Sequence, residues 1–127
     1  MRLEEFRMEI RRLKDDEKNQ GRAIIRFATV REFRSFRYRI RVEDNFDRDR
    51  RHMVFTLRGV RAPLNLMPDS GAGVAELLLS GLEGEYQVTV VGARNSIDFR
   101  ITVDQSGARL TEPPPEGSLT VVTDMDR

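Results

Sequence analysis

The sequence predicts an all-β protein, an antiparallel β-sandwich with a short helix at its N-terminus. Its 127 residues fit one domain with a single hydrophobic core. After residue 21, short runs of alternating apolar and charged residues recur, and this period of two is typical of strands with one buried face. Turns rich in Gly, Pro and Asp separate the runs. No helical segments alternate with them, which favours an antiparallel sheet.

Residues 1–20 are expected to form a helical extension before the sandwich domain. Their content of Met, Arg, Leu, Glu and Lys favours a helix that ends near Gly21. A strand is the alternative, because Phe6, Met8 and Ile10 also alternate with charged residues, but β-branched residues are almost absent. We expect the apolar stripe of the helix to bury against the sandwich or against another copy. The stripe consists of Leu3, Phe6, Ile10 and Leu13.

Residues 21–105 are expected to form the sandwich domain itself. Its predicted strands are residues 22–30, 34–43, 52–58, 74–80, 85–91 and 96–104. The last strand is the clearest, because Ile97, Phe99 and Ile101 alternate with polar residues. The inward positions of these strands predict the core, which consists of Ile25, Phe27, Phe36, Tyr38, Ile40, Val42, Met53, Phe55, Leu57, Leu77, Tyr86, Val88, Val90, Ile97, Phe99 and Ile101.

Residues 106–127 are expected to form a proline-rich spacer, a short terminal strand and a tail. The stretch TEPPPEG favours a stiff, extended polyproline conformation. Residues 119–123 then have the composition of a strand. We expect this strand to join its own sheet, with a frayed end or pairing to the edge of a neighbouring molecule as alternatives.

The composition excludes several classes of protein. No apolar run approaches the ~20 residues that span a bilayer, so no membrane span is expected. The start of the chain, MRLEEFRMEIRR, lacks the apolar segment of a secretion signal, which favours a cytoplasmic protein, or an extracellular one if the chain is an excised module. Cysteine is absent from the sequence, which removes disulfides, thiolate nucleophiles and cysteine-bound metals.

Charge is unevenly distributed along the chain. Residues 1–20 are neutral, residues 21–61 carry +7 and residues 62–127 carry −6, within a total of +1. A protein with a basic half and an acidic half can pair with itself, within one molecule or between copies. It is a poorer match to a long polyanion than a uniformly basic domain would be.

The basic half carries a row of arginines on the predicted outward face, namely Arg26, Arg37, Arg39 and Arg41. Arginine favours bidentate contacts with carboxylates and phosphates. We expect the row to pair with acids, either Glu76 on a neighbouring strand or acids across a subunit contact. Binding of nucleic acid or another polyanion is the alternative. It is less favoured because Phe36 and Tyr38 occupy core-facing positions, where they cannot stack on bases.

No pattern predicts a catalytic residue, a cofactor or a metal. His52 is the one histidine of the sequence, and its spacing from the serines does not predict a catalytic triad. The stretch EDNFDRD has the spacing of the first ligands of a calcium loop, but its sixth position is Arg50 rather than Gly. A charged hairpin is therefore favoured, and calcium stays open as the alternative. The calcium ligands would include Asn45, Asp47 and Asp49.

Three stretches follow one another along the chain: RIRVEDNFDRDRRHMVFTL, DSGAGVAELLLSGLEGEYQVTVVG and SIDFRITV. In this order they resemble bacterial immunoglobulin-like modules of the invasin and intimin adhesins, over about residues 22–104. The resemblance implies an immunoglobulin-like sandwich that serves as a spacer or presenting module and has no catalytic apparatus. We therefore expect a non-enzymatic module for protein–protein interaction or assembly, which self-associates as a homo-oligomer.

Overall fold

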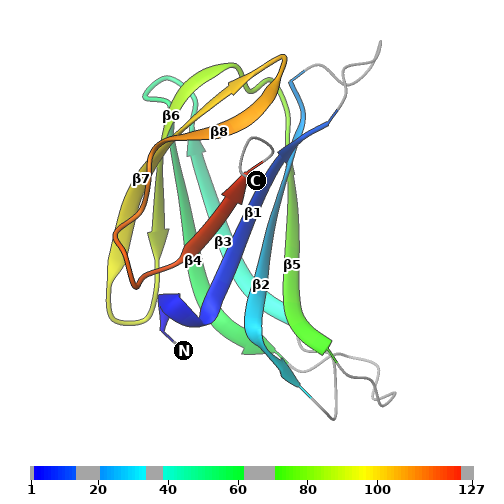
Figure 1. The fold of residues 1–127 in the computed structure, drawn as a ribbon, viewed down its shortest axis with the longest axis vertical. Coiled ribbons are helices and arrows are strands. Elements are labelled where there is room, and N and C mark those ends of the chain that lie inside the picture. Colours follow the sequence, from blue (N-terminus) through cyan, green and yellow to red (C-terminus); the bar gives the residue numbers. More distant parts are fainter. Residues whose placement is uncertain (1, 14–20, 34–38, 62–70, 124–127) are drawn as a thin grey trace.

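The computed structural model describes residues 2–13, 21–33, 39–61 and 71–123. These residues form nine strands in one mixed sheet that is nearly closed into a barrel (Figure 1). The strands are β1 (Phe6–Arg12), β2 (Ala23–Phe33), β3 (Arg39–Asp47), β4 (His52–Arg61), β5 (Gly71–Leu79), β6 (Gly84–Val91), β7 (Ser96–Asp104), β8 (Gly107–Glu112) and β9 (Thr120–Thr123). Within the described residues, no helix is long and apolar enough to cross a membrane.

The strands follow the order β8-β7-β6-β4-β3-β5-β2-β1-β9 across the sheet. Neighbours are antiparallel except at β1–β9, β3–β5 and β4–β6, which are parallel. The all-β prediction is confirmed, whereas the purely antiparallel, immunoglobulin-like sandwich is not. Parallel strands are joined by long connections rather than by tight hairpins. The alternation of residues along one strand therefore carries no information about these pairings.

The predicted N-terminal helix is wrong. Residues Leu3–Glu5 form a single 3-10 turn, and Phe6–Arg12 form strand β1. The side chains of Phe6, Met8 and Ile10 are buried, and charged side chains point outward between them. β1 pairs with β2 along Phe6–Arg12 and with β9 along Arg7–Ile10, so both of its edges have partners within the sheet. This pairing and the burial of alternate residues outweigh a helix propensity worth only tenths of a kcal/mol per residue.

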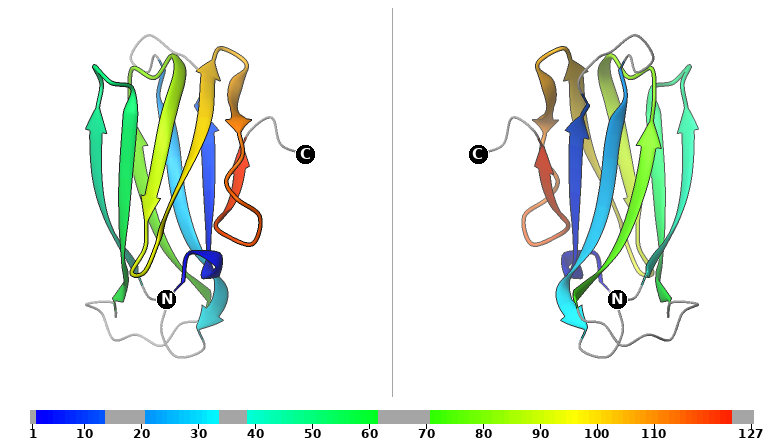
Figure 2. Two further views of the ribbon diagram at one scale, coloured as in Figure 1. Left: turned by 90° about the vertical axis from the view of Figure 1, so that its left-hand side faces the viewer. Right: turned by 90° about the vertical axis from the view of Figure 1, so that its right-hand side faces the viewer.

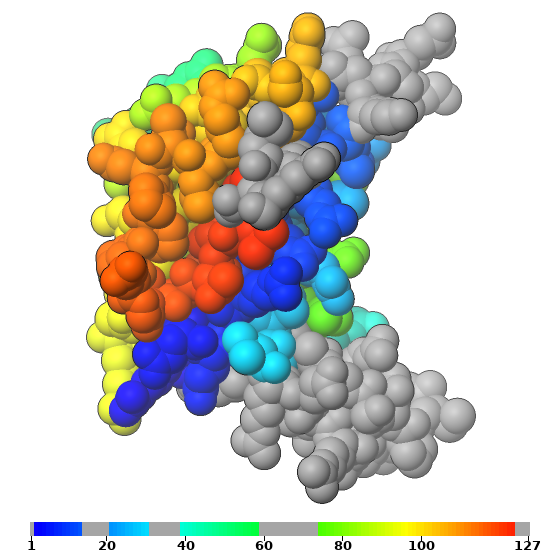
Figure 3. Space-filling view, viewed as in Figure 1, coloured from blue at the N-terminus to red at the C-terminus, as the bar shows by residue number. Residues whose placement is uncertain are grey.

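The C-terminal strand was expected to join its own sheet, and this prediction is confirmed. Thr120–Thr123 form β9, which runs parallel to β1, and Leu119 and Val121 are buried. The sequence did not predict β8, which pairs with β7. β8 and β9, the two ends of the strand order, contact each other and bring the barrel close to closure. Figure 3 shows the blue N-terminal and red C-terminal segments packed side by side on this face.

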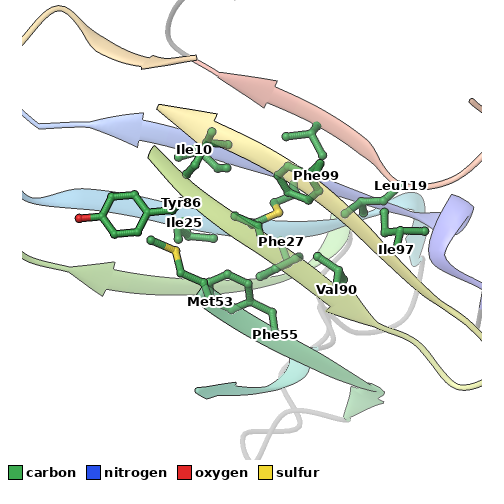
Figure 4. Close-up of a cluster of buried hydrophobic side chains, with 14 of the residues drawn as sticks. Ile10, Ile25, Phe27, Met53, Phe55, Tyr86, Val90, Ile97, Phe99 and Leu119 are labelled. Atoms are coloured by element: carbon green, nitrogen blue, oxygen red, sulfur yellow. The ribbon is translucent and has the colours of Figure 1, made fainter. Parts of the chain in front are cut away.

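The core fills the inside of the barrel with side chains from both halves of the sheet (Figure 4). The rings of Phe27 and Phe55 meet edge to face with centroids 5.5 Å apart. Each fully buried side chain of this size contributes roughly 1.5–3 kcal/mol to folding. Most of the predicted core is confirmed, but Val42 and Leu77 are only partly buried. Phe36 and Tyr38, also predicted in the core, lie outside the described residues.

Candidate interaction surfaces

The outer face of β2 and β5 carries exposed apolar side chains. The register places Ile24 opposite Leu78, and Ala28 opposite Val74. Leu78 is 49% exposed, and Val30, further along β2, is 64% exposed. The right-hand panel of Figure 2 looks onto this side of the barrel, with β5 and β2 in front. Single apolar side chains at this exposure are ordinary, but here Leu78 and Val30 lie in a row with the partly buried Ile24, Ala28 and Val74, which makes the face a candidate for interaction.

An ion pair lies in the middle of this apolar row. Arg26 on β2 and Glu76 on β5 are register partners, with 3.6 Å between Nε and Oε1. On its other side Arg26 faces Glu9 of β1, whose carboxylate lies within 3.6 Å of Arg7 and 3.8 Å of Arg11. From the sequence, Glu76 is expected to lie beside the arginines of residues 34–43. Its strand does meet β3 at one bridge, but its carboxylate pairs with Arg26 instead.

A second candidate surface lies where β3 and β4 pair irregularly. Ile40 is opposite Val60 but Val42 is opposite Leu57, so the strands are out of step by one residue between these pairs. Arg39 and Arg41 are exposed here, and with Arg58 of β4 they line a hollow of about 320 Å³. β-Bulges of this kind often lie at functional positions because they re-aim side chains.

The other residues predicted to make contacts differ in their burial. Leu3, Phe6 and Ile10 are buried in the core of their own chain, so this stripe packs against its own sheet rather than against another copy. Leu13 is partly buried just beyond β1. Arg37 lies outside the described residues. Of the predicted contact residues in the described part, the three arginines on β2 and β3 remain accessible to a partner.

The outer face of β6, β7 and β8 satisfies its own charges. Arg100 lies between Glu85 and Glu112, with N–O distances of 2.9 and 3.3 Å. The hydrogen bond to Glu85 and then the charge of Glu112 raise the pKa of Arg100 above its ordinary value. Asp104 accepts hydrogen bonds from the Ser106 backbone N–H and from Arg109. These contacts, the Ser106 bond first, hold the pKa of Asp104 below its usual value, although partial desolvation opposes them.

His52 belongs to a hydrogen-bonded chain across three strands. Its Nε2 lies 2.7 Å from Thr89 Oγ1, and the Thr89 hydroxyl donates to Asp98. In a catalytic triad the histidine lies between the nucleophile and the acid. Here the Thr89 hydroxyl lies in the middle and donates its hydrogen bond to the Asp98 carboxylate. The hydroxyl hydrogen therefore points away from His52, which is not placed to act as a base toward it. The arrangement joins β4, β6 and β7 on their outer face.

The hairpin between β3 and β4 uses its arginines to hold the connection between β5 and β6. Arg48 donates to the Ser80 carbonyl at 3.0 Å, with its guanidinium 4.7 Å from the centre of the Phe46 ring. Arg51 donates to the Glu83 carbonyl at 2.6 Å and lies 5.2 Å from the centre of the Tyr86 ring. Guanidinium groups on aromatic faces contribute about 0.5–1 kcal/mol each at exposed sites.

The calcium alternative falls in the same hairpin. Asp47 accepts a hydrogen bond from the Arg50 backbone N–H at 3.1 Å and forms an ion pair with its side chain at 3.8 Å. Asn45 and Asp49 are exposed. Within the described residues, no three side chains of metal-binding type gather into a group that could hold an ion.

A further hollow of about 360 Å³ lies at one end of the barrel and is lined in part by Arg12, Glu83 and Asp104. Arg109 and Ser106 already engage Asp104, so its carboxylate is committed within the sheet. The Asp104 carboxylate is therefore less available to a ligand than the arginines of β3.

Sequence reasoning missed the apolar row on β2 and β5. The signal was present in Leu77–Leu79 of the VAELLLS stretch, since in an alternating strand one of three successive leucines must face outward. Sequence reasoning also missed Arg58 as a member of the arginine surface, because the irregular pairing that aligns it with β3 has no local signature. No protein-family model matches the chain, and neither a curated protein nor a solved structure matches it.

Proposed function

We propose that the chain is a non-enzymatic assembly module that pairs with a second copy of itself through the outer face of β2 and β5. The exposed apolar row around the Arg26–Glu76 ion pair is the observation that carries the proposal. Removing these side chains from water favours association by about 25 cal/mol for each Å² buried.

Charge selects one arrangement of the two copies. A two-fold axis parallel to the strands, between β2 and β5, places Arg26 of one copy over Glu76 of the other, and the reverse. The same axis places Ile24 over Leu78 of the second copy. An axis across the strands would instead place Arg26 over Arg26, and two like charges in contact repel. The face is therefore self-complementary in one orientation.

The contact is expected to be reversible. Two strands offer less than the ~800 Å² per partner that standard stable interfaces bury. We therefore expect a monomer–dimer equilibrium that depends on protein concentration, measured by size-exclusion chromatography with light scattering over a dilution series. Leu78→Asp should abolish the dimer, because it places an unpaired carboxylate in the apolar row. Gln87→Glu adds the same charge to the outer face of β6 and should leave the dimer unchanged.

A charge-exchange experiment identifies the partner residues. Arg26→Glu and Glu76→Arg should each fail to dimerise alone, because each gives every copy two like charges at the axis. Mixed in equal amounts, the two variants should form a heterodimer, since every acid then lies over an arginine. A wild-type chain that is monomeric at all concentrations overturns the proposal. A dimer that survives Leu78→Asp, or a mixture that stays monomeric, overturns this face as its interface.

A further inference from the structure

We infer that the irregular pairing of β3 and β4 forms a binding site for a dianionic phosphate group. Between the pairs Ile40–Val60 and Val42–Leu57, β3 has one residue, Arg41, and β4 has two. One of those two is Arg58, and Arg41 and Arg58 line the same hollow. Like charges close together on a sheet destabilise the pairing, unless an anion lies between them. This inference is independent of the proposed self-association.

The charges of the site favour a phosphate over a carboxylate. Arg39, Arg41 and Arg58 line the hollow of about 320 Å³, and Glu43 is the one acidic residue in its described lining. Glu43 is bound to Arg58, with 3.1 Å between Oε2 and Nη2. Within the described part of the chain, neither Arg39 nor Arg41 forms an ion pair. The lining therefore carries two positive charges in excess, which match the charge of about −1.5 to −2 on a phosphomonoester at pH 7.

The geometry of the site also suits phosphate oxygens. Each guanidinium presents several N–H donors in a planar fork, which fits two oxygens of one phosphate at once. Arg39 and Arg41 are exposed, so their donors are available without breaking an internal ion pair. Apolar Ile40 and Val42 complete the described lining, and no aromatic side chain is among its members. A polynucleotide site usually adds aromatic rings that stack on bases, so a single phosphate group is the better fit.

The test is a titration with inorganic phosphate and with O-phosphoserine. Calorimetry measures the affinity, and NMR chemical-shift changes at Arg41 and Arg58 locate the site. We expect both compounds to bind at low salt. Arg41→Ala should weaken binding about tenfold or more, because it removes a charged hydrogen-bond donor. Glu43→Gln should strengthen binding about two- to fivefold, since the competing carboxylate is lost. Arg50→Ala, an exposed arginine in the β3–β4 hairpin, should leave binding unchanged.

Several results would overturn the inference. One is the absence of phosphate binding to the wild-type chain at low salt. Equal weakening by Arg41→Ala and Arg50→Ala would show attraction by general charge rather than by a site. Single-stranded DNA bound far more tightly than either phosphate compound, with loss on Arg41→Ala, would assign the surface to nucleic acid. Light scattering on the same variants keeps the two proposals separate, because Arg41→Ala should not change the dimer.

Discussion

On the outer face of β6, β7 and β8, Arg100 and Arg109 form ion pairs with acids, whereas on the outer face of β3 neither Arg39 nor Arg41 forms an ion pair within the described residues. Arg100 is held by Glu85 and Glu112, and Arg109 by Asp104. In contrast, Arg39, Arg41 and Arg58 line one hollow, and Glu43, which is paired with Arg58, is the one acid in its described lining. The two faces belong to the same sheet and share one core. Exposed ion pairs add at most about 1 kcal/mol each to stability but neutralise the surface, whereas charges without such a partner are free to attract a ligand.

The largest expected effect tests whether the two faces share that core. Phe99→Ala, beneath β7, and Phe27→Ala, beneath β2, each remove a ring that is about 1% exposed or less. Each should lower the free energy of unfolding by about 3–5 kcal/mol, measured by urea denaturation. Unfolding should remain a single transition in both variants, because one cooperative core supports the whole sheet. Two separate transitions would show that the halves of the barrel fold independently.

A smaller effect distinguishes the two arginine environments directly. Arg100→Ala should lower the urea midpoint, because it leaves Glu85 and Glu112 without the cation between them. Arg41→Ala should leave the midpoint unchanged or raise it, since it removes a like-charge neighbour of Arg58. The difference between the variants should shrink in high salt, which screens exposed charges. If Arg41→Ala lowers the midpoint as much as Arg100→Ala, the contrast between the faces is wrong.

The smallest expected effect is the loss of the stabilising contribution of Asp104 at acidic pH. The folded-state pKa of Asp104 is lowered, so its contribution to stability is present above the unfolded pKa of about 3.8 and is lost as pH falls through the folded pKa. Asp104→Asn should therefore be slightly less stable than the wild-type chain at pH 7, and equally stable well below pH 3.8. Urea midpoints measured at several pH values provide the test. A difference that persists unchanged in acid would place its cause in packing rather than in ionisation.

Most strands could be predicted from the sequence because their buried faces are regular. The alternation of Ile97, Phe99 and Ile101 predicts β7 with its observed ends, and all three side chains are buried. β8 was missed because its buried residues, Gly107 and Ala108, are adjacent and small, so no apolar alternation marks the strand. β1 was assigned to a helix because propensity is a local property, whereas its strand conformation depends on partners about 20 and 110 residues away.

The candidate surfaces were less predictable than the strands. Arg39 and Arg41 were identified as outward-facing from their alternation alone, and the structure agrees. Arg58 could not be assigned to the same surface, because it lies on another strand, which an irregular register aligns with β3. Likewise, the pairing of Arg26 with Glu76 required the order of the strands in the sheet, which residue patterns do not encode. The alternation along one strand predicts which face a side chain lies on. Its neighbours on the adjacent strands depend on the strand order and register, which the local sequence does not reveal.

The parallel pairing of β1 with β9 has a consequence for the order in which the protein is made. On the ribosome, β1 leaves the exit tunnel before every other strand of the sheet, and β9 after all of them. Until residues 120–123 are synthesised, one edge of β1 has no partner and can pair with other chains. Closure of the barrel must therefore follow translation of β9. Between the synthesis of β1 and that of β9 the nascent chain therefore carries an open edge, which a holdase chaperone that binds extended segments would protect.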